Sequence, residues 1–523
     1  MLFSACRSGS NSEEIIEIID NPNEPPTVPT VMITVGNDYT GAIKVNYLEK
    51  PASTSTTTKT ISGTVADGAV QLASYPPRGS LIVSIQAGAE TNPPIHYIGR
   101  LIGSSAISLK LKLNNLGNLE LRPADSDSNK IPIGTYAEFQ LINGTLGSNY
   151  KQEADIDLMG DSGLGVPDWE PIGTSTAAFT GTYDGDGKLI KRLYINADTR
   201  DNVGLFGYAT GSATFTDVHI ASGSVTGKIY VGGLLGYGYD NSAGAISDCS
   251  NAADITSTSY AGTCAAGGVV GSTSAIMTRC SNSGTVTGSG GRVGGVAGAS
   301  YANMVLCSNS GKVENSSNRT GGVLGYMYGG YPNSTSILGC SNTGDITASG
   351  VVGGILGNGQ KRVEITACYN TGNITSTTPG YMTGGILGGT YEIESMAWFY
   401  ITACYNIGEV KGKTAAGGIA GLLNSTDSLN ACYSTGKITG DSDIHSMVGN
   451  KENSNTTVTA CYWKANGATS PSSDSTGYTE ITGNFFTPPS TGEWGTGDGS
   501  ESGKYWKANV DYTENLPKLW YEE

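Results

Sequence analysis

The sequence predicts an all-β protein in which the second half is a solenoid of stacked parallel coils. Seven Gly-Gly-hydrophobe-x-Gly cassettes recur along it, and successive cassettes start 27 to 35 residues apart. A fixed period of about 30 residues is typical of a repeat array, in which each unit buries its apolar face only against its neighbours. The cassettes start at Gly232, Gly267, Gly294, Gly321, Gly353, Gly384 and Gly417.

The second half of each repeat is a Cys-x-Asn-x-Gly-x-(Ile/Val) segment, as at Cys340, Asn342, Gly344 and Ile346. Small or apolar residues alternate with polar ones, which predicts a strand with one buried face. Asn and Gly tolerate left-handed backbone conformations, so we expect each copy to turn at these residues. The alternation and the turn together make each repeat one coil of the array.

Eight of the ten cysteines occupy one position of this repeat. Neighbouring coils stack about 4.8 Å apart, within reach of a disulfide, but in-register parallel strands point their Cβ atoms the same way and fit disulfide torsion poorly. We interpret the column as buried, reduced thiols, with inter-coil disulfides as the alternative. No Cys-x-x-Cys or adjacent histidine accompanies it, which disfavours metal binding. The column comprises Cys249, Cys280, Cys307, Cys340, Cys368, Cys404, Cys432 and Cys461.

A lead-in segment precedes the cassettes and comprises Ile133-Gly134-Thr135, Tyr150, Asp155-Ile156-Asp157-Leu158, Trp169-Glu170-Pro171-Ile172-Gly173 and Phe179-Thr180-Gly181-Thr182-Tyr183-Asp184-Gly185. The cassettes resemble the GLUG motif, which occurs in tandem on bacterial surface proteins and beside some IgA-specific metallopeptidases, and the lead-in resembles what precedes such arrays. The resemblance spans residues 131 to 465. It implies a right-handed parallel β-helix, a handedness that periodicity leaves open. Such arrays serve as stalks, adhesive modules and enzyme appendages.

Two further regions flank the β-helix, which we place at residues 129–465. Residues 31–128 carry short alternating segments at 31–35, 42–47, 81–85 and 109–113 and predict a small β-sandwich domain. Residues 466–523 leave the repeat period, and we expect them to form a C-terminal cap over the open end of the array, because an uncovered coil edge would pair with another chain. The cap carries Phe485, Phe486, Trp494, Trp506 and Trp520.

Residues 1–30 predict a lipoprotein signal remnant followed by a flexible tether. Phe3-Ser4-Ala5-Cys6 resembles the end of a bacterial lipoprotein signal, which makes Cys6 the expected lipid-attachment site. The basic start and most of the apolar stretch of such a signal peptide are missing, so a late-assigned start codon and a chance match are the alternatives. The Ser, Asn, Glu and Pro-rich residues 7–30 suit a tether, and Glu13 and Glu14 favour surface export in Bacteroidetes-like bacteria.

Composition disfavours several partners and reactions. The formal net charge is −16 and there is no long run of Lys or Arg, which disfavours binding to nucleic acid. The sequence contains no stretch of 18 apolar residues, so it predicts no membrane-spanning helix. The sequence has no His-Glu-x-x-His, nucleophile elbow or phosphate loop. Asp345 and Glu409 share an outward row two coils apart, near the upper limit for inverting glycosidases, but the mixed charges of this row indicate a solvated face. We therefore expect no catalytic residues and no enzyme.

Asp184-Gly185-Asp186-Gly187 has the Asp-x-Asp-Gly spacing of a calcium loop, so Asp184 and Asp186 are calcium candidates. The Glu that ends an EF-hand loop is missing, which favours a hairpin turn between residues 179–183 and 189–194 instead. Asp155 and Asp157 flank Ile156 and are interpreted as surface residues. We expect no other metal and no cofactor.

Tyrosines follow the glycine cassettes, where variable loops begin, and Trp398 lies just before a repeat strand. Exposed aromatic rows can stack against the apolar face of a sugar ring or bind a protein partner, and the alternative is that these rings fill the corners of the coil. The candidate ligand-binding aromatics are Tyr237, Tyr239, Tyr326, Tyr328, Tyr331 and Trp398.

Together these features predict a non-catalytic lipoprotein of the outer membrane, facing the cell exterior, whose β-helix is an adhesive or glycan-binding surface. The expected partners are the outer membrane, through the lipid anchor, and a glycan or a host or cell-surface protein. The alternatives are a structural spacer or assembly component of a surface complex and a polysaccharide-degrading β-helix enzyme.

Overall fold

The computed structural model divides the chain into two compact units, Met1–Thr145 and Leu146–Glu523. In the first unit it describes residues 32–33, 41–48, 59–66, 69–72, 81–87, 99–100, 110–111, 130–134, 139 and 141–144. In the second it describes residues 146–522 except 159–167, 239–243, 318, 331–332, 391–397, 425, 452–455, 474–475, 484–485, 489–493, 498, 500–503 and 508–515.

The N-terminal unit contains an antiparallel sheet in the strand order β4-β3-β2-β5-β6 and a parallel pair of β1 with β7. The four segments predicted as strands correspond to β1, β2, β5 and β7. The β1–β7 pair is a second, two-stranded sheet, and the sandwich stays a prediction. The elements are β1 (Met32–Ile33), β2 (Gly41–Leu48), β3 (Lys59–Ala66), β4 (Ala69–Leu72), β5 (Leu81–Ala87), β6 (Gly99–Arg100), β7 (Lys110–Leu111), β8 (Ile131–Ile133) and the short 3-10 helix η1 (Leu141–Gly144).

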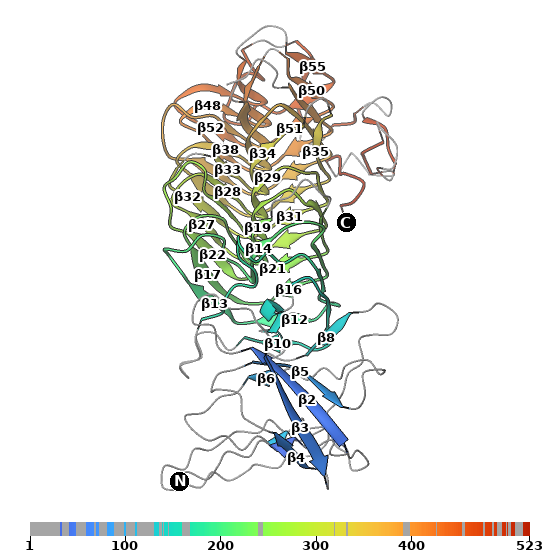
Figure 1. Ribbon diagram of the computed structural model, residues 1–523. Coiled ribbons are helices and arrows are strands. Elements are labelled where there is room, and N and C mark those ends of the chain that lie inside the picture. The colour runs from blue at the N-terminus through green and yellow to red at the C-terminus, as the bar shows by residue number, and fades with distance from the viewer. Residues whose placement is uncertain are drawn as a thin grey trace, which may run out of the picture. The chain divides into compact units, whose positions relative to one another are not determined.

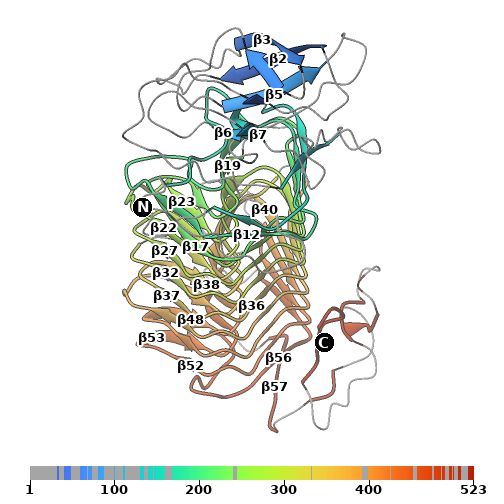
Figure 2. The ribbon, with the colours of Figure 1, turned by 90° about the horizontal axis from the view of Figure 1, so that it is seen from below.

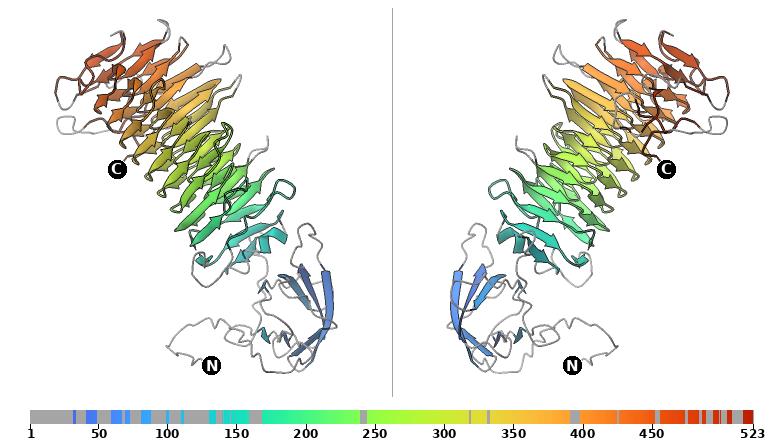
Figure 3. Two further views of the ribbon diagram at one scale, coloured as in Figure 1. Left: turned by 90° about the vertical axis from the view of Figure 1, so that its left-hand side faces the viewer. Right: turned by 90° about the vertical axis from the view of Figure 1, so that its right-hand side faces the viewer.

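The second unit is a β-solenoid of about ten turns, which confirms the stacked parallel coils (Figure 1). One full coil runs through β30 (Met304–Val305), β31 (Ser308–Asn309), β32 (Val313–Asn315), β33 (Arg319–Gly321) and β34 (Leu324–Tyr328). Each strand pairs in parallel with the equivalent strand of the next coil, so five long sheets run along the axis. Figure 3 shows the coils following one another in sequence order.

We number the sheets by the order in which one coil passes through them. Sheet 1 contains β9 (Asn149–Gln152), β11 (Thr182–Asp184), β15 (Thr214–Thr216), β20 (Ala245–Ser247), β25 (Ile276–Thr278), β30, β35 (Thr335–Leu338), β40 (Arg362–Thr366), β45 (Trp398–Thr402), β50 (Ser428–Asn430) and β55 (Thr457–Thr459). Sheet 2 contains β10 (Ile156–Asp157), β12 (Leu189–Lys191), β16 (His219–Ile220), β21 (Ser250–Asn251), β26 (Ser281–Asn282), β31, β36 (Ser341–Asn342), β41 (Tyr369–Asn370), β46 (Tyr405–Asn406), β51 (Tyr433–Ser434), β56 (Cys461–Trp463) and β57 (Tyr478–Glu480).

The other three sheets complete the coil. Sheet 3 contains β13 (Leu193–Asn196), β17 (Gly223–Gly227), β22 (Asp254–Ser257), β27 (Val286–Gly288), β32, β37 (Ile346–Ala348), β42 (Ile374–Ser376), β47 (Val410–Lys411) and β52 (Ile438–Thr439). Sheet 4 contains β18 (Val231–Gly232), β23 (Ala265–Gly267), β28 (Arg292–Gly294), β33, β38 (Val351–Gly353), β43 (Thr383–Gly384), β48 (Thr414–Gly417) and β53 (Ser442–His445). Sheet 5 contains β14 (Phe206–Ala209), β19 (Leu235–Gly238), β24 (Val270–Thr273), β29 (Ala297–Ser300), β34, β39 (Leu356–Gln360), β44 (Leu387–Thr390), β49 (Ala420–Leu423) and β54 (Val448–Lys451).

The glycine cassettes lie where sheet 4 turns sharply into sheet 5. A Cβ atom on Gly294, the first glycine of one cassette, would lie 2.0 Å from the carbonyl oxygen of Ala297. A Cβ atom on the second glycine, Gly295, would lie 2.2 Å from Cγ of Asn309 and 2.1 Å from the carbonyl oxygen of Gly322. The cassette is glycine-rich because backbone meets backbone here and an asparagine of the Cys-x-Asn segment fills the remaining space.

The asparagines of that segment form a ladder inside the solenoid, each at most 2% exposed. Every Nδ2 except that of Asn406, the last in the ladder, donates to Oδ1 of the asparagine in the next coil at 2.7–2.9 Å. Each also donates to the carbonyl oxygen two residues later in its own coil, again at 2.7–2.9 Å. The ladder therefore satisfies polar groups that burial would otherwise leave unpaired. It comprises Asn251, Asn282, Asn309, Asn342, Asn370 and Asn406.

The prediction that Asn and Gly of this segment supply the left-handed turn is wrong. The left-handed residue is the one immediately before the column cysteine, for example Arg279 with φ 51° and Leu306 with φ 55°. The segment's glycine is required for close approach instead, because a Cβ atom on Gly284 would lie 2.1 Å from the carbonyl oxygen of Ala253. The turn therefore falls on residues whose type varies between repeats.

The eight column cysteines and Cys264 lie in the structure as free, buried thiols. The sulfur of Cys340 is 3.7 Å from the carbonyl oxygen of Met304 in the previous coil, and the N–H of Cys307 donates to that sulfur at 3.3 Å. Burial raises the pKa of the thiols of Cys340, Cys368 and Cys404 well above its usual value. Neutral, enclosed thiols are poor nucleophiles, which fits the interpretation of inert packing residues.

Alkylation should report this directly. We expect the eight column thiols and Cys264 to resist iodoacetamide in the native protein and to react fully in denaturant without added reductant, because all nine thiols are buried and a raised pKa further suppresses the thiolates of Cys340, Cys368 and Cys404. Mass spectrometry of the peptides measures the modified fraction at each cysteine. Column cysteines that stay unmodified in denaturant until a reductant is added would show disulfides.

The segment after the last coil is only partly the predicted end cap. The carbonyl oxygens of Ser470 and Pro471 accept hydrogen bonds from the N–H groups of Ser446, Met447 and Val448 in the last coil, and β57 pairs with β56. The described residues of 486–522, which we call the C-terminal strap, instead lie beside the coils (Figures 1 and 2). Their side chains cover the outer face of sheet 2.

A column of stacked tyrosines explains why the strap lies on the flank. Tyr369, Tyr405 and Tyr433 occupy the same outward position in successive coils, with ring centroids 5.1 and 4.7 Å apart. Trp494, Trp506 and Leu519 pack against this column, which removes apolar ring surface from water. The Tyr433 hydroxyl donates to the carbonyl oxygen of Pro517 at 2.7 Å, and the Tyr405 hydroxyl donates to Glu522.

The strap should bind less firmly as the pH rises. Burial raises the pKa of the Glu522 carboxyl above its usual value, against the opposing hydrogen bond from Tyr405 and the charges of Lys518 and Lys507. The docked strap therefore holds this proton more tightly than the undocked strap, and its stability falls as the pH rises from about 4 through the raised pKa. Guanidinium titrations followed by tryptophan emission between about pH 4 and pH 7 measure this effect. Glu522→Gln should flatten the pH dependence, and an unchanged slope in that variant would contradict the assignment.

Candidate functional site

Three of the predicted aromatics converge on one surface formed by sheets 4 and 5. Tyr237 lies on β19, and Tyr326 and Tyr328 lie on β34, where they flank the buried Met327 and so share the opposite face of the strand. Two arginines and two more tyrosines join them. We call this surface the tyrosine–arginine patch, and it comprises Tyr230, Tyr237, Arg292, Tyr301, Arg319, Tyr326 and Tyr328.

Ring stacking and cation–π contacts hold the patch together. The rings of Tyr301 and Tyr328 stack with centroids 4.0 Å apart and an interplanar angle of 2°. Tyr326 is 7% exposed and its ring lies under both guanidinium groups, 4.9 Å from Cζ of Arg292 and 4.8 Å from Cζ of Arg319. Its hydroxyl donates to Oε1 of Gln360 at 3.1 Å. The partly buried rings give the patch a fixed geometry.

The phenols of Tyr230 and Tyr301 remain protonated at neutral pH. Burial raises the pKa of Tyr230, and the nearby Arg292 opposes that shift. Burial and a hydrogen bond with Tyr328 raise the pKa of Tyr301, again opposed by Arg292. A neutral phenol can donate a hydrogen bond, which a phenolate cannot.

The remaining predicted aromatics lie elsewhere. Tyr239 and Tyr331 are outside the described residues. Trp398 is on β45 in sheet 1, where the guanidinium carbon of Arg362 lies 5.4 Å from its ring and 5.3 Å from that of Tyr400. This is a second, smaller aromatic–cation contact on a different sheet from the patch.

Sequence reasoning missed the arginines. Arg292 and Arg319 stand two residues before the first glycine of successive cassettes, in Arg292-Val293-Gly294 and Arg319-Thr320-Gly321. They are paired in register on adjacent coils. Because the cassette fixes the position of sheet 4, this shared offset is the signal that could have placed both side chains beside the tyrosines of sheet 5.

The calcium candidates lie in a turn with cationic neighbours. The N–H of Asp186 donates to Oδ1 of Asp184 at 3.0 Å, and the Asp186 carboxylate lies 3.3 Å from Nζ of Lys151 and 3.8 Å from Nζ of Lys188. The expected hairpin is wrong: the flanking strands β11 and β12 belong to sheets 1 and 2 and pair only in parallel with other coils. Asp155 and Asp157 form exposed ion pairs with Lys191 and Arg192.

The row of outward carboxylates is also locally paired. Oδ1 of Asp345 accepts hydrogen bonds from the backbone N–H and the amide of Asn373 at 2.9 and 3.1 Å, and the Glu409 carboxylate lies 3.5 Å from Nζ of Lys437. Asn373 lies between the two acids along the sheet, so they do not face a shared cavity. Across the described residues, no group of three or more His, Cys, Asp or Glu side chains is arranged to hold a metal ion.

A groove of about 320 Å³ crosses the outer face of sheet 2, and its lining residues Ser250 and His219 form a serine–histidine–aspartate chain with the neighbouring Asp217. Nδ1 of His219 lies 2.8 Å from Oγ of Ser250, and Nε2 lies 3.0 Å from Oδ1 of Asp217. The backbone N–H groups of Ser250, Ala252, Ser281 and Ser283 donate to carbonyl oxygens of the preceding coil. Those amides are therefore not available to stabilise an oxyanion beside Ser250.

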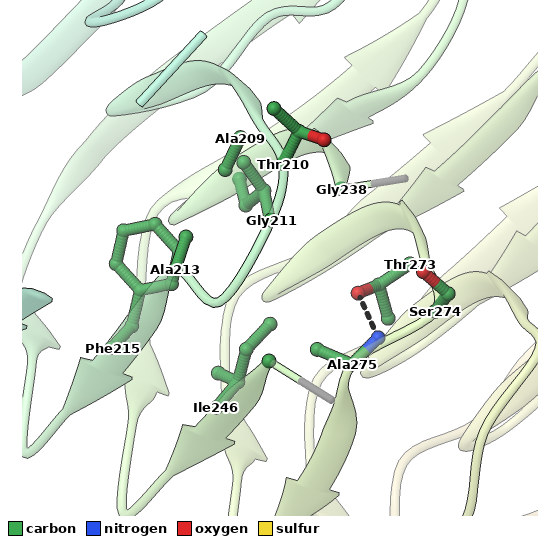
Figure 4. A pocket seen from close by; sticks show the side chains of 12 residues that line it. Ala209, Thr210, Gly211, Ala213, Phe215, Gly238, Ile246, Thr273, Ser274 and Ala275 are labelled. Carbon is green, nitrogen blue, oxygen red and sulfur yellow. Dashed lines mark hydrogen bonds between the residues drawn. The ribbon is translucent and has the colours of Figure 1, made fainter. Parts of the chain in front are cut away.

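A smaller cavity of about 20 Å³ lies where sheets 1 and 5 approach each other, lined by Phe215, Leu235 and Ile246 among others (Figure 4). At this cavity the N–H of Ala275 donates to Oγ1 of Thr273 at 3.0 Å. A space of this size holds about one water molecule and is too small for a sugar. No helix in the described part of the chain has the length and hydropathy needed to cross a bilayer.

The fold and the patch define a β-solenoid repeat protein with an aromatic and cationic surface. No protein-family model matches the chain. A stretch of 110 residues, 20% of the chain, is 36% identical to halomucin of Haloquadratum walsbyi and spans 1% of that protein. Another stretch of 112 residues, also 20% of the chain, is 30% identical to a Gly-rich membrane protein of Evansella cellulosilytica and spans 13% of it.

Two solved structures are also similar to the chain. One is a Bacteroides ovatus protein named as an immunoglobulin A1 protease, with 19% identity and a TM-score of 0.35 over 65% of this chain and 86% of that chain. The other is an IgA1 protease, with 14% identity and a TM-score of 0.36 over 79% of this chain and 30% of that chain. Both likenesses concern the fold alone.

Proposed function

We propose that the chain is a non-catalytic cell-surface lipoprotein whose β-helix displays a glycan-binding, adhesive face. Cys6 is the proposed lipid-attachment site, residues 7–30 are the tether, and the outer membrane is the proposed site of anchoring. The proposal includes a right-handed β-helix and an N-terminal sheet that is one layer of a small sandwich. The partner is a glycan, on a host or another cell surface.

The tyrosine–arginine patch is the observation that supports this function. Rigid aromatic rings offer flat apolar area at low entropic cost, and a sugar ring stacks its apolar face on such a surface while its hydroxyls meet polar donors. Tyr301 is 39% exposed, and Tyr328 lies flat against it. Tyr328 lies on β34 and Tyr301 directly follows β29, so the two coils fix the spacing of these rings.

A glycan array with the soluble chain tests the proposal. We expect Tyr301→Ala to weaken binding by about ten-fold, because a stacked aromatic contact is worth about 1 kcal/mol or somewhat more. Tyr381→Ala is the matched control, because Tyr381 is also 39% exposed but lies outside the patch. Equal losses in both variants would contradict a site at the patch. Antibody labelling of intact cells against residues 131–465 separately tests surface display.

The absence of catalysis can be tested at Ser250, whose hydroxyl is hydrogen-bonded to His219 in the serine–histidine–aspartate chain. Its hydrogen bond to His219 follows from their register on adjacent coils, and the neighbouring amides are engaged in the sheet. We expect no labelling of the native chain by a fluorophosphonate probe. Labelling that disappears in Ser250→Ala would show a reactive serine and contradict the non-catalytic proposal.

The spacer alternative predicts the opposite outcome at the patch. If the solenoid only separates other components, replacing Tyr301 or Tyr328 leaves every interaction of the chain unchanged and no sugar binds. If the chain binds no glycan on the array and these variants still assemble into their complex, the spacer alternative is favoured.

A further inference from the structure

The tyrosine–arginine patch carries two positive charges in direct register, which is unusual in this acidic chain. Arg292 pairs with Arg319 along sheet 4, and the same position holds Ala265 in the coil before and Val351 in the coil after. Like charges directly opposite each other destabilise a sheet. The pair is therefore a local feature of two coils and not a property of the repeat.

Three other arginines of the solenoid have carboxylate partners. Arg192 lies 2.7 Å from Asp157, Arg279 lies 2.6 Å from Asp248, and Arg200 lies 2.8 Å from Glu170. Arg292 is in no ion pair with a described residue: its guanidinium lies over the rings of Tyr326 and Tyr328, and Nη1 donates to the carbonyl oxygen of Thr263 at 3.4 Å. An unneutralised guanidinium beside a second one creates a positive potential at the patch.

On this basis we infer that the patch binds an anionic glycan, with the acidic group of a sugar bridging Arg292 and Arg319 while its ring lies against Tyr301 and Tyr328. This inference rests on the proposed glycan-binding function and names its ligand class. The ring of Tyr326 fixes both guanidinium groups from below, 4.9 and 4.8 Å from their carbon atoms. A planar fork held in this way presents paired N–H donors that match a carboxylate or a sulfate group.

Recognition of an anion depends on the arginine pair itself. The chain as a whole carries −16, so long-range steering does not attract an anion and the local pair must supply recognition. Binding should therefore weaken with salt, as expected for a contact of two cations with one anionic group.

The test compares oligogalacturonate with its methyl ester, which keeps the sugar ring and removes the charge. With the whole soluble chain we expect the acid to bind about ten-fold or more tightly than the ester by calorimetry, and Arg292→Gln and Arg319→Gln each to remove that difference. Arg279→Gln is the matched control, because Arg279 is an exposed arginine outside the patch. A sulfated chondroitin oligosaccharide in a parallel arm distinguishes sulfate from carboxylate as the acidic group.

Each outcome decides a separate question. Equal binding of acid and ester would overturn the anionic ligand class and leave glycan binding in place. Loss of acid binding in Arg279→Gln as well would show a non-specific charge effect and also overturn the inference. If circular dichroism shows a folded protein that binds neither the acid, the ester nor the sulfated glycan, this inference is overturned. If the chain also binds no neutral glycan on the array, the proposed glycan-binding function is overturned as well.

Discussion

Replacing Gly295 by alanine should destabilise the solenoid by about 3 kcal/mol or more. The added Cβ would lie 2.1 Å from the carbonyl oxygen of Gly322 and 2.2 Å from Cγ of Asn309. Neither neighbour is the flexible end of an exposed side chain: one is backbone of the next coil, and the other is locked in the asparagine ladder. Relief requires the coils to separate locally, which breaks ladder hydrogen bonds.

Chemical denaturation followed by circular dichroism measures the loss in Gly295→Ala as a shift in midpoint. Gly262→Ala is the matched control, because a Cβ at Gly262 meets no atom within 4 Å. It should leave the midpoint unchanged within about 0.5 kcal/mol. A Gly295→Ala protein as stable as the control would mean that the coils are looser than the structure describes.

Asn309→Ala should cost about 4 kcal/mol, since three buried polar groups lose a partner and each unsatisfied group costs about 1–3 kcal/mol. Nδ2 of Asn282 loses its acceptor in the next coil, Oδ1 of Asn342 loses its donor, and the carbonyl oxygen of Gly311 loses a side-chain hydrogen bond. The interior leaves little room for compensating water beyond the space of the deleted amide.

Asn373→Ala is the control for the ladder. Asn373 makes a side-chain hydrogen bond to Asp345 between adjacent coils, as Asn309 does to Asn342, but its side chain is on the exposed surface. Its removal should cost less than about 1 kcal/mol, because water replaces the lost partner. Similar losses for Asn309→Ala and Asn373→Ala would show that burial of the ladder adds nothing to its strength.

These two residues also show how far the sequence specifies the fold. Gly295 and Asn309 belong to motifs whose spacing predicts a coil, because every coil must repeat the same close contacts. Periodicity does not reveal that the two motifs touch, and the left-handed residue before each cysteine was missed because Arg279, Leu306 and Ala367 share no residue type. The solenoid was predictable because its contacts repeat, whereas the turn depends on backbone alone.

The candidate site was only partly predictable for a related reason. Tyr237, Tyr326 and Tyr328 follow the cassettes and were found from that offset, whereas Arg292 and Arg319 precede them and meet the tyrosines only after sheet 4 folds against sheet 5. The strap was misplaced because Trp494 and Trp506 contact tyrosines of several coils, and contacts between one unique segment and many repeats leave no periodic trace in the sequence.

The asparagine ladder gives the solenoid an internal direction. Every amide from Asn251 to Asn370 donates forward, toward the C-terminal coil, so the amide dipoles align head to tail along the axis. Such a chain polarises cooperatively, and reversing one amide would place two donors or two acceptors against each other. The asparagine amide of a coil grafted into the array must therefore point in the same direction as the others, and the coil must also match in shape. The solenoid could be lengthened by whole repeats without altering the arginine pair.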